Sequence, residues 1–262
     1  MTKVAIIGGG NMGGAIARGL IKGKLISAQD ITVSDISEKI LADLNTVSNE
    51  WKLTHSNREA IRGADIIILA VKPWLVEKIS GEIANTIDYK SQILVSIAAG
   101  VDFFTLKKLF NDEAVIFRII PNTAIEVLES VSTITSVNAD KEKINLVSSI
   151  FEELGKVFYV ESEKILNAYM SLSSCGIAYA FRYIRAAMEG GVEMGINPNV
   201  AKEVVMQTLK GAVKLLETNQ SHPEAEIDKV TTPGGITIKG LNEMEANGFT
   251  NAVIKGLKKS LP

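Results

Sequence analysis

The sequence has little from which a metal centre or a disulfide could be built. It contains one cysteine, Cys175, and two histidines, His55 and His222, in 262 residues. A single cysteine excludes a disulfide within the chain and is typical of proteins that work in a reducing cytoplasm. The two histidines lie too far apart in sequence to suggest ligands of one metal ion. We therefore expect no metal site and a cytoplasmic location.

Long apolar runs and blocks of like charge are also missing. No window reaches about eighteen uninterrupted apolar residues, the length that crosses a membrane. The 28 Lys and Arg residues nearly balance the 30 Asp and Glu residues, and they form no basic block. A β-run begins at Lys3, so we expect no signal peptide. We expect a small-molecule partner, and neither a nucleic acid nor a membrane.

Residues 3–20 combine an apolar β-run, a glycine-rich turn and a helical pattern. Gly8, Gly10 and Gly13 have G-x-G-x-x-G spacing. Glycines at these positions permit a tight turn, close approach of the backbone to a pyrophosphate, and close packing of the helix on the strand. The helix start offers free N–H groups and a positive dipole end to the same pyrophosphate. The stretch predicts a dinucleotide site; the alternative is a structural turn without a ligand.

Strands alternate with helices up to residue 160, and only helices follow. Strands are expected at 31–35, near 53, and at 65–71, 92–97, 114–120, 131–136 and 157–160. The alternation predicts a doubly wound parallel sheet, a Rossmann domain, in residues 1–160. Residues 161–262 should form an all-helical domain. Its long helix at 177–195 is rich in small residues, and its apolar faces exceed what about a hundred residues can bury alone, which predicts an interleaved homodimer.

Asp35 ends the second strand, where a dinucleotide fold places the carboxylate that binds the ribose 2′-OH. A carboxylate there repels a 2′-phosphate and so favours NADH. The alternative is that Asp35 only caps the next helix. The segments around Ala70–Lys72 and Ala98 end two further strands, at the edge where open α/β sheets bind ligands. Ordinary strand-end turns would look the same.

A second informative stretch lies at 231–240. Gly234 and Gly235 form a turn before a helix, and the free N–H groups there make an anion site of the size of a carboxylate. Thr237 adds a hydroxyl in the first helical turn. The alternative is a plain helix start. No lysine lies between Lys164 and Lys202, so a hydroxy-acid dehydrogenase would lack its acid or base, whereas an imine needs only a hydride and polar positioning.

Together these motifs resemble pyrroline-5-carboxylate reductases over essentially the whole chain. The resemblance is carried by IIGGGNMGGAIARG, AVKP, SIAAG, RIIPNTA, SLSSCGIAYAF, EGGVEMG and above all TTPGGITIKGL. It implies reduction of L-1-pyrroline-5-carboxylate to L-proline with NADPH or NADH, the last step of proline biosynthesis. It also implies a homodimer through the helical domain, which in some members assembles into a ring of five dimers.

The motifs and the resemblance give one set of expected site residues. Cofactor contacts are expected at Gly8, Gly10, Asn11, Met12, Gly13, Ser34, Asp35, Asn57, Ala70, Val71, Lys72 and Ala98. Substrate contacts are expected at Val230, Thr232, Gly234, Gly235 and Thr237. The resemblance makes Thr237 the catalytic residue, hydrogen-bonded to the ring nitrogen. Two alternatives stay open: an enzyme like 3-hydroxyacid dehydrogenases, and a non-catalytic regulatory protein that binds a dinucleotide.

Overall fold

The computed structural model describes residues 2–261 and divides them into two compact units. The first unit runs through Ser174, and the second is Cys175–Leu261. The sequence-based boundary at residue 160 lies at the end of the last strand. The structural division falls later because the next helix, α7 (Glu163–Tyr169), packs on the sheet and belongs to the first unit.

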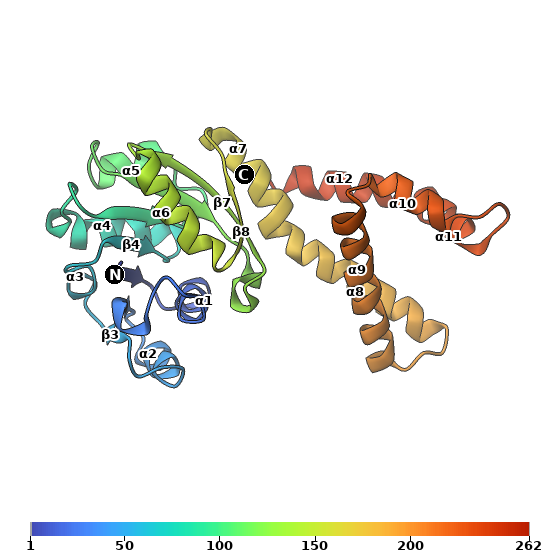
Figure 1. Ribbon diagram of the computed structural model, residues 1–262, viewed down its shortest axis with the longest axis horizontal. Coiled ribbons are helices and arrows are strands. Elements are labelled where there is room, and N and C mark those ends of the chain that lie inside the picture. Colours follow the sequence, from blue (N-terminus) through green and yellow to red (C-terminus); the bar gives the residue numbers. More distant parts are fainter. Residues whose placement is uncertain (1, 262) are drawn as a thin grey trace. The chain divides into compact units, whose positions relative to one another are not determined.

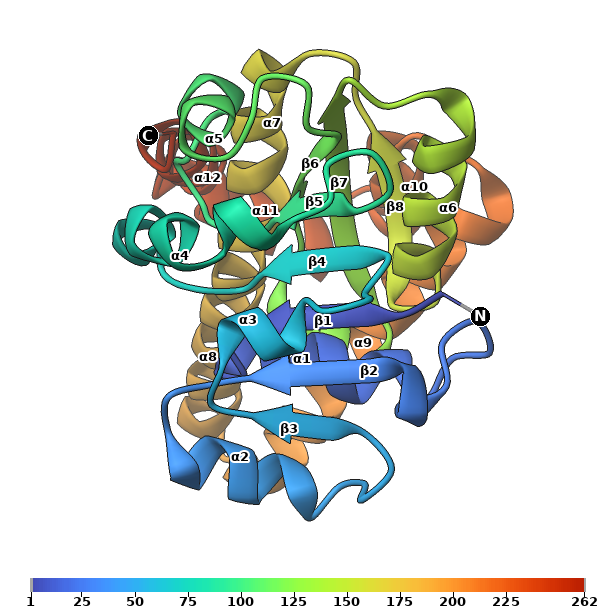
Figure 2. The ribbon, with the colours of Figure 1, turned by 90° about the vertical axis from the view of Figure 1, so that its left-hand side faces the viewer.

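The described part of the first unit is built on one eight-stranded sheet (Figures 1 and 2). The strands are β1 (Val4–Ile7), β2 (Ile31–Ser34), β3 (Lys52–Thr54), β4 (Ile66–Leu69), β5 (Ile93–Ser96), β6 (Ile116–Ile120), β7 (Ser130–Val137) and β8 (Gly155–Tyr159). Their order in the sheet is β3-β2-β1-β4-β5-β6-β7-β8. The chain therefore reverses its direction of travel between β1 and β4, and ligands of such sheets bind at this reversal.

Six of these strands form the parallel sheet that the alternation predicts, but β7 departs from it. β7 runs antiparallel to β6, with Arg118 opposite Thr135. A parallel neighbour needs a crossover of about a dozen residues or more, usually a helix. Here only a short loop with a 3₁₀ turn, Thr123–Val127, joins the two strands. The helix α6 (Lys141–Glu152) then returns the chain so that β8 lies parallel to β7.

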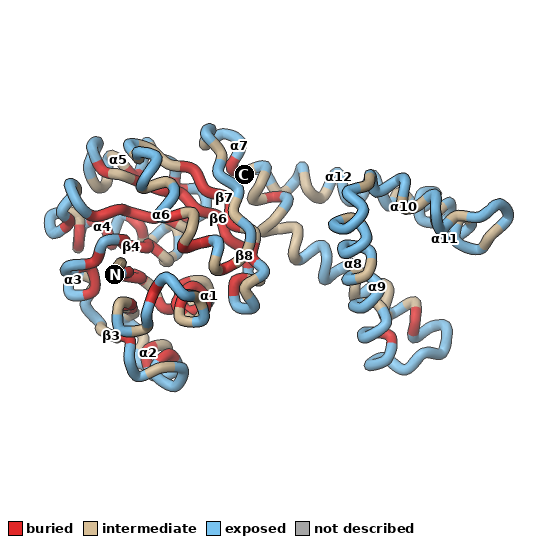
Figure 3. The backbone as a smooth tube through the Cα atoms, viewed as in Figure 1, coloured by how far each residue is buried: buried red, intermediate tan, exposed pale blue. Residues whose placement is uncertain are grey.

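Helices cover both faces of the sheet, as a doubly wound fold requires. The remaining helices of this unit are α1 (Asn11–Leu20), α2 (Glu38–Asn45), α3 (Asn57–Ala60), α4 (Val76–Ile83) and α5 (Phe103–Leu109). Ile6 of β1 belongs to the apolar cluster that includes residues of α1, α2 and α6, whereas its neighbour Ile7 belongs to the cluster that includes residues of α3, α4 and α5. Successive side chains of a strand point to opposite faces, so the central strands are buried on both sides (Figure 3).

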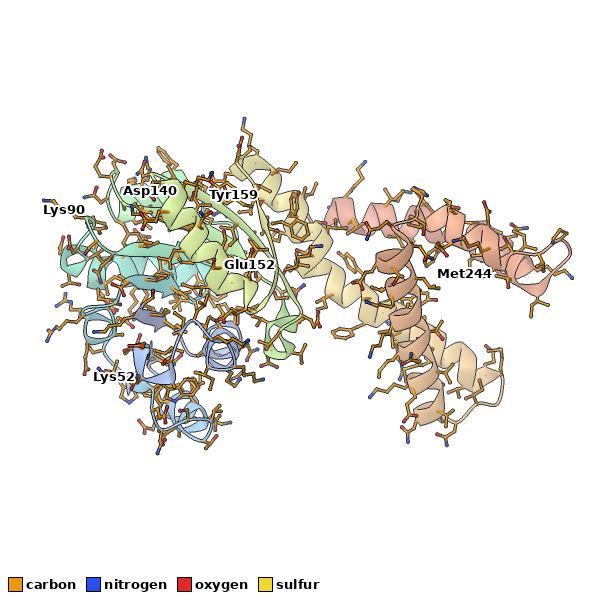
Figure 4. All side chains as sticks on the ribbon, viewed as in Figure 1. Lys52, Lys90, Asp140, Glu152, Tyr159 and Met244 are labelled. Atoms are coloured by element: carbon orange, nitrogen blue, oxygen red, sulfur yellow. The ribbon has the colours of Figure 1, made fainter. Side chains whose placement is uncertain are left out.

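Side-chain caps fix where several of these helices begin. Asp102 caps α5 and accepts a hydrogen bond from the Thr105 N–H at 2.8 Å. Asp140 caps α6 in the same way (Figure 4). α2 is capped by Ser37, whose hydroxyl accepts from the Ile40 N–H at 3.4 Å. Asp35 is therefore not the cap of that helix.

A partly buried ion pair attaches α7 to the sheet. Arg118 on β6 is only 5% exposed, and its Nη1 lies 2.5 Å from Oε1 of Glu163, the first residue of α7. The same oxygen accepts the Phe103 N–H at 2.8 Å, at the start of α5. One carboxylate thus connects β6, α5 and α7. A π-helical segment, Met170–Cys175, follows α7.

The second unit is all-helical, as predicted. Its helices are α8 (Gly176–Glu193), α9 (Pro198–Asn219), α10 (Pro223–Val230), α11 (Ile236–Ala246) and α12 (Phe249–Lys259). Small residues allow α8 and α9 to approach closely at Gly191, where a Cβ would lie 3.2 Å from Cβ of Ala201. Between residues 2 and 261, no helix has the length and apolar character needed to cross a membrane.

Many large apolar side chains of the second unit face solvent in the single chain. They include Phe181, Met194, Val204, Met206, Val213, Leu215, Phe249, Val253 and Ile254, each more than a third exposed. The unit buries almost no large side chain of its own: Gly191 and Ala201 are the buried residues of α8 and α9. Exposed apolar surface of this extent marks a protein–protein interface.

We predict that Glu163→Ala lowers the free energy of unfolding by about 3 kcal/mol, because it leaves the buried Arg118 charge without its partner. Urea unfolding followed by circular dichroism measures the change. Glu161→Ala, an exposed glutamate two positions earlier, is the control and should change stability little. Equal effects of the two substitutions would show that the Arg118–Glu163 pair does not hold α7.

Candidate functional site

A cavity of about 1140 Å³ lies in the first unit where β1, β2, β4 and β5 end. These carboxyl ends lie side by side in the sheet (Figure 2). The predicted cofactor residues that line the cavity are Gly8, Gly10, Asn11, Met12, Ser34, Asp35, Asn57, Ala70, Val71, Lys72 and Ala98. Residues far apart in sequence are thus brought to one place. We call this cavity the cleft.

The turn after β1 gives the cleft its floor. Gly8 has φ +99°, and a Cβ there would lie 2.7 Å from the carbonyl oxygen of Ala70, so only glycine fits. Its N–H donates to the Ser34 carbonyl at 2.8 Å. A Cβ on Gly10, by contrast, would meet nothing within 4 Å. The open space at Gly10 is room that a diphosphate can occupy.

The start of α1 supplies donors to that space. Its N-cap residue is Gly10, and no side chain caps the helix. The first N–H groups of a helix have no partner within it, so they remain available to an anion. The residues present therefore fit the diphosphate of a dinucleotide.

Gly13 is the one predicted cofactor residue that packs behind the cleft. A Cβ there would overlap the carbonyl oxygen of Gly8 and approach Cβ of Ala70 to 2.9 Å. The third glycine of the motif thus lets α1 lie directly against the ends of β1 and β4. Its contribution is packing, which is the third role that the motif assigns.

Asp35 is held at the edge of the cleft by two backbone donors. Its Oδ2 accepts the Gly9 N–H at 2.8 Å, and its Oδ1 accepts the Ser37 N–H at 2.8 Å. A carboxylate oxygen can accept more than one hydrogen bond, so both oxygens retain capacity for a ligand hydroxyl. The next residue, Ile36, also lines the cleft and is 89% exposed.

His55 contacts the same corner of the sheet from the loop after β3. Its Nδ1 lies 2.9 Å from the Asp35 carbonyl oxygen, and its Nε2 lies 2.9 Å from Glu38 Oε2. Both partners can only accept, so the arrangement needs a proton on each ring nitrogen. The hydrogen bond to the Asp35 carbonyl, followed by that to Glu38, accordingly raises the pKa of His55 above 6.5.

A three-residue network crosses the cleft wall. The hydroxyl of Ser34, a buried residue, donates to Asn57 Oδ1 at 2.8 Å, and Asn57 Nδ2 donates to Glu82 Oε2 at 2.6 Å. Glu82 and Lys78, both on α4, line the cleft but were not found from the sequence. No local signal marks them, because only the packing of α3 against α4 brings them there.

The predicted substrate residues lie in the second unit, around the turn before α11. The Gly235 N–H donates to the Thr232 carbonyl at 2.9 Å, and Gly234 has φ +73°. Thr232, Pro233, Gly234 and Gly235 are thus the four residues of a type II turn, with proline second and a glycine of positive φ third. Gly235 is the N-cap of α11 and no side chain caps the helix. Its first N–H groups and the exposed Thr237 side chain share one helical turn.

Val230 is another of the predicted substrate residues. It is the last residue of α10, is 61% exposed and lies close in sequence to the turn.

Within residues 2–261, no three His, Cys, Asp or Glu side chains are grouped so that they could hold a metal ion.

Segments of both units match known protein families. Residues 163–261 match the family described as pyrroline-5-carboxylate reductase dimerisation, and residues 3–100 match NADP oxidoreductase, coenzyme F420-dependent. The chain is 33% identical to pyrroline-5-carboxylate reductase 2 of Dictyostelium discoideum, over 98% of this chain and 90% of that protein. The chain belongs to the pyrroline-5-carboxylate reductase family.

Other members of the family match almost the whole length of this chain. The pyrroline-5-carboxylate reductase of Methanosarcina acetivorans is 33% identical, over 98% of this chain and 96% of that one. Pyrroline-5-carboxylate reductase 1 of D. discoideum is 36% identical, but this chain spans only 48% of its length. A Plasmodium falciparum pyrroline carboxylate reductase structure with NADP bound has a TM-score of 0.91 at 28% identity, covering 99% of this chain and 95% of that one.

Membership of the reductase family decides between the candidate functions. The chain is an NAD(P)H-dependent oxidoreductase with a dimerisation domain, and the resemblance inferred from its motifs is confirmed. A 3-hydroxyisobutyrate dehydrogenase of Mycobacterium tuberculosis, at 14% identity and a TM-score of 0.54, shares the fold alone. The hydroxyacid dehydrogenase and regulatory-protein alternatives are not favoured.

The hydrogen bonds of His55 predict a pH-dependent contact at the edge of the cleft. Because folding raises the pKa of His55, its stabilising contribution is complete below pH 6.5 and is lost as the pH rises through the folded-state pKa. Glu38→Gln should lower that pKa in part, since the larger cause, the Asp35 carbonyl, remains. An NMR titration of the His55 ring signals, in the unmodified protein and in Glu38→Gln, measures this pKa. An unchanged His55 titration would show that Glu38 does not contact the ring in solution.

Proposed function

We propose that this reductase converts L-1-pyrroline-5-carboxylate to L-proline, with the cofactor in the cleft of the first unit and the substrate at the turn before α11. The observation that carries the assignment of the substrate is that turn, where an uncapped helix start and a threonine hydroxyl occur together. The substrate carries a carboxylate, which matches the uncapped helix start, and a ring nitrogen, which matches the threonine hydroxyl.

In this proposal the cleft holds the cofactor through groups of three kinds. The open space at Gly10 and the N–H groups of α1 receive the diphosphate. The Asp35 carboxylate accepts from the adenosine ribose. The strand-end segment Ala70–Lys72 and Ala98 line the far part of the cleft. The reduced nicotinamide ring, when bound, supplies the hydride.

The substrate side relies on backbone and hydroxyl donors. The N–H groups that follow Gly234 and Gly235 hold the carboxylate at the positive end of α11. The Thr237 hydroxyl contacts the ring nitrogen and so fixes the orientation of the electrophilic carbon. An iminium nitrogen already carries its proton, so the chain needs no acid or base for the transfer itself. The catalytic gain then comes mainly from alignment.

We also propose how the chain assembles and where in the cell it works, which family membership alone does not give. The exposed apolar side chains of α8, α9 and α12 support a homodimer in which these helices cover one another. A ring of five such dimers remains our proposal for the full assembly. The single free cysteine, Cys175, supports a cytoplasmic location.

We propose NADH as the preferred cofactor because the carboxylate of Asp35 faces the cleft. The two backbone donors that hold it fix a negative charge where NADPH would carry its 2′-phosphate. Asp35→Ser should shift the ratio of kcat/KM for NADH and NADPH towards NADPH. Steady-state kinetics with each cofactor measure it. If the unmodified enzyme already prefers NADPH by about tenfold, about 1.4 kcal/mol, Asp35 does not select the cofactor.

Thr237→Val tests the substrate site, because it keeps the shape of the side chain and removes only the hydroxyl. In an assay that follows the absorbance of NADH with pyrroline-5-carboxylate, kcat/KM should fall roughly ten- to a hundredfold, the loss of one hydrogen bond to a charged group. NADH affinity and thermal stability should barely change. Thr237→Ser retains the hydroxyl and should retain most of the activity. Normal turnover by Thr237→Val, or loss of NADH binding instead, would place the substrate elsewhere.

A further inference from the structure

Glu82 is a charged residue of the cleft that the proposed mechanism does not use. It lies on α4, is half-buried, and lines the cleft beside Lys78. Its Oε2 accepts the Asn57 side-chain N–H at 2.6 Å. The other end of the same amide accepts the Ser34 hydroxyl at 2.8 Å. Three elements, β2, α3 and α4, therefore meet at one amide group.

The chemistry of the three groups makes Glu82 the member that decides how the amide points. An ionised carboxylate can only accept, so the Asn57 NH₂ must face Glu82 and its carbonyl must face Ser34. The Ser34 hydroxyl can donate or accept, so it tolerates either orientation of the amide. Without the carboxylate, the two flipped forms of Asn57 would both find a partner in Ser34. The hydrogen bond to the carboxylate is also the stronger of the two, because it is charge-assisted.

The orientation of Asn57 matters because the side chain lines the cleft. In the observed arrangement one amide hydrogen and one carbonyl lone pair remain after the bonds to Glu82 and Ser34 are made. A flip exchanges the donor and the acceptor that a ligand meets. We propose that Glu82 is a positioning residue for the dinucleotide, which it serves by fixing the amide of Asn57. This inference rests on the proposed use of the cleft as the cofactor site.

A second contact indicates that the Glu82 side chain is not needed to hold α3 against α4. Arg58 Nε donates to the backbone carbonyl of Glu82 at 2.6 Å, and this bond already holds α3 to α4. It does not involve the carboxylate, so it survives any substitution of the side chain. Gln92 also donates to the carbonyls of Ile61 and Ala64, just after α3. Removing the carboxylate should therefore leave α3 in place.

The test measures NADH affinity directly, from the fluorescence of the reduced nicotinamide on titration, for Glu82→Ala, Asn57→Ala and the double variant. We expect each single substitution to raise Kd about tenfold, with the unfolding temperature nearly unchanged. The double variant should match Asn57→Ala within about twofold, because Glu82 acts only through that side chain. Glu82→Gln, which keeps an acceptor oxygen and adds a donor, should lie between.

Glu77→Ala is the matched control, since it removes the same charge from the exposed side of the same helix. It should leave Kd unchanged. The proposal is overturned if Glu82→Ala binds NADH normally, if the two effects simply add, or if Asn57→Ala has no effect on Kd. A failure of the proposed function is a separate result: the unmodified enzyme would bind NADH but would not oxidise it with pyrroline-5-carboxylate.

Discussion

The close approach of two strand ends is the constraint on which the rest of the first unit depends. Gly8 must turn under the carbonyl of Ala70, and Gly13 must let α1 lie against the carbonyl of Gly8. Any Cβ at either position would separate β1, β4 and the helix. The same absence of side chains leaves the space at Gly10 open and the start of α1 uncapped. Tight packing and anion binding are therefore two consequences of one backbone arrangement.

Carboxylates organise the part of the cleft beyond that turn. Asp35 is anchored by the N–H groups of Gly9 and Ser37, and Glu82 by the amide of Asn57. The donors to Asp35 are backbone N–H groups, which hold its carboxylate in place, whereas the donor to Glu82 is a side-chain amide. His55 adds a positive charge behind Asp35 when it is protonated. The polar wall is thus preorganised before a ligand arrives, which lowers the cost of binding.

The second unit follows a different physical rule. Its helices touch through small residues such as Gly191 and Ala201, while large side chains such as Phe181 and Phe249 stay exposed in the single chain. The unit Cys175–Leu261 buries little apolar area of its own, since Gly191 and Ala201 are the buried residues of α8 and α9. Residues 163–261 match a dimerisation family, which agrees with an exposed apolar surface of this kind being a protein–protein interface. The turn at Gly234 and Gly235 sits on this unit and so belongs to the part of the chain that dimerises.

Local patterns in the sequence determined the order of strands and helices, the glycine turn, the cap at Asp102 and the turn before α11, because each depends on residues only a few positions apart. The antiparallel direction of β7 follows from a loop too short for a crossover; the strands expected at 114–120 and 131–136 already leave only this short gap, but the alternation of strands and helices alone predicts a parallel neighbour. The later end of the first unit depends on Arg118 reaching Glu163, and the cleft wall depends on α4 bringing Glu82 to Asn57. Such contacts join residues distant in the chain, and their geometry exists only after the sheet has brought them together.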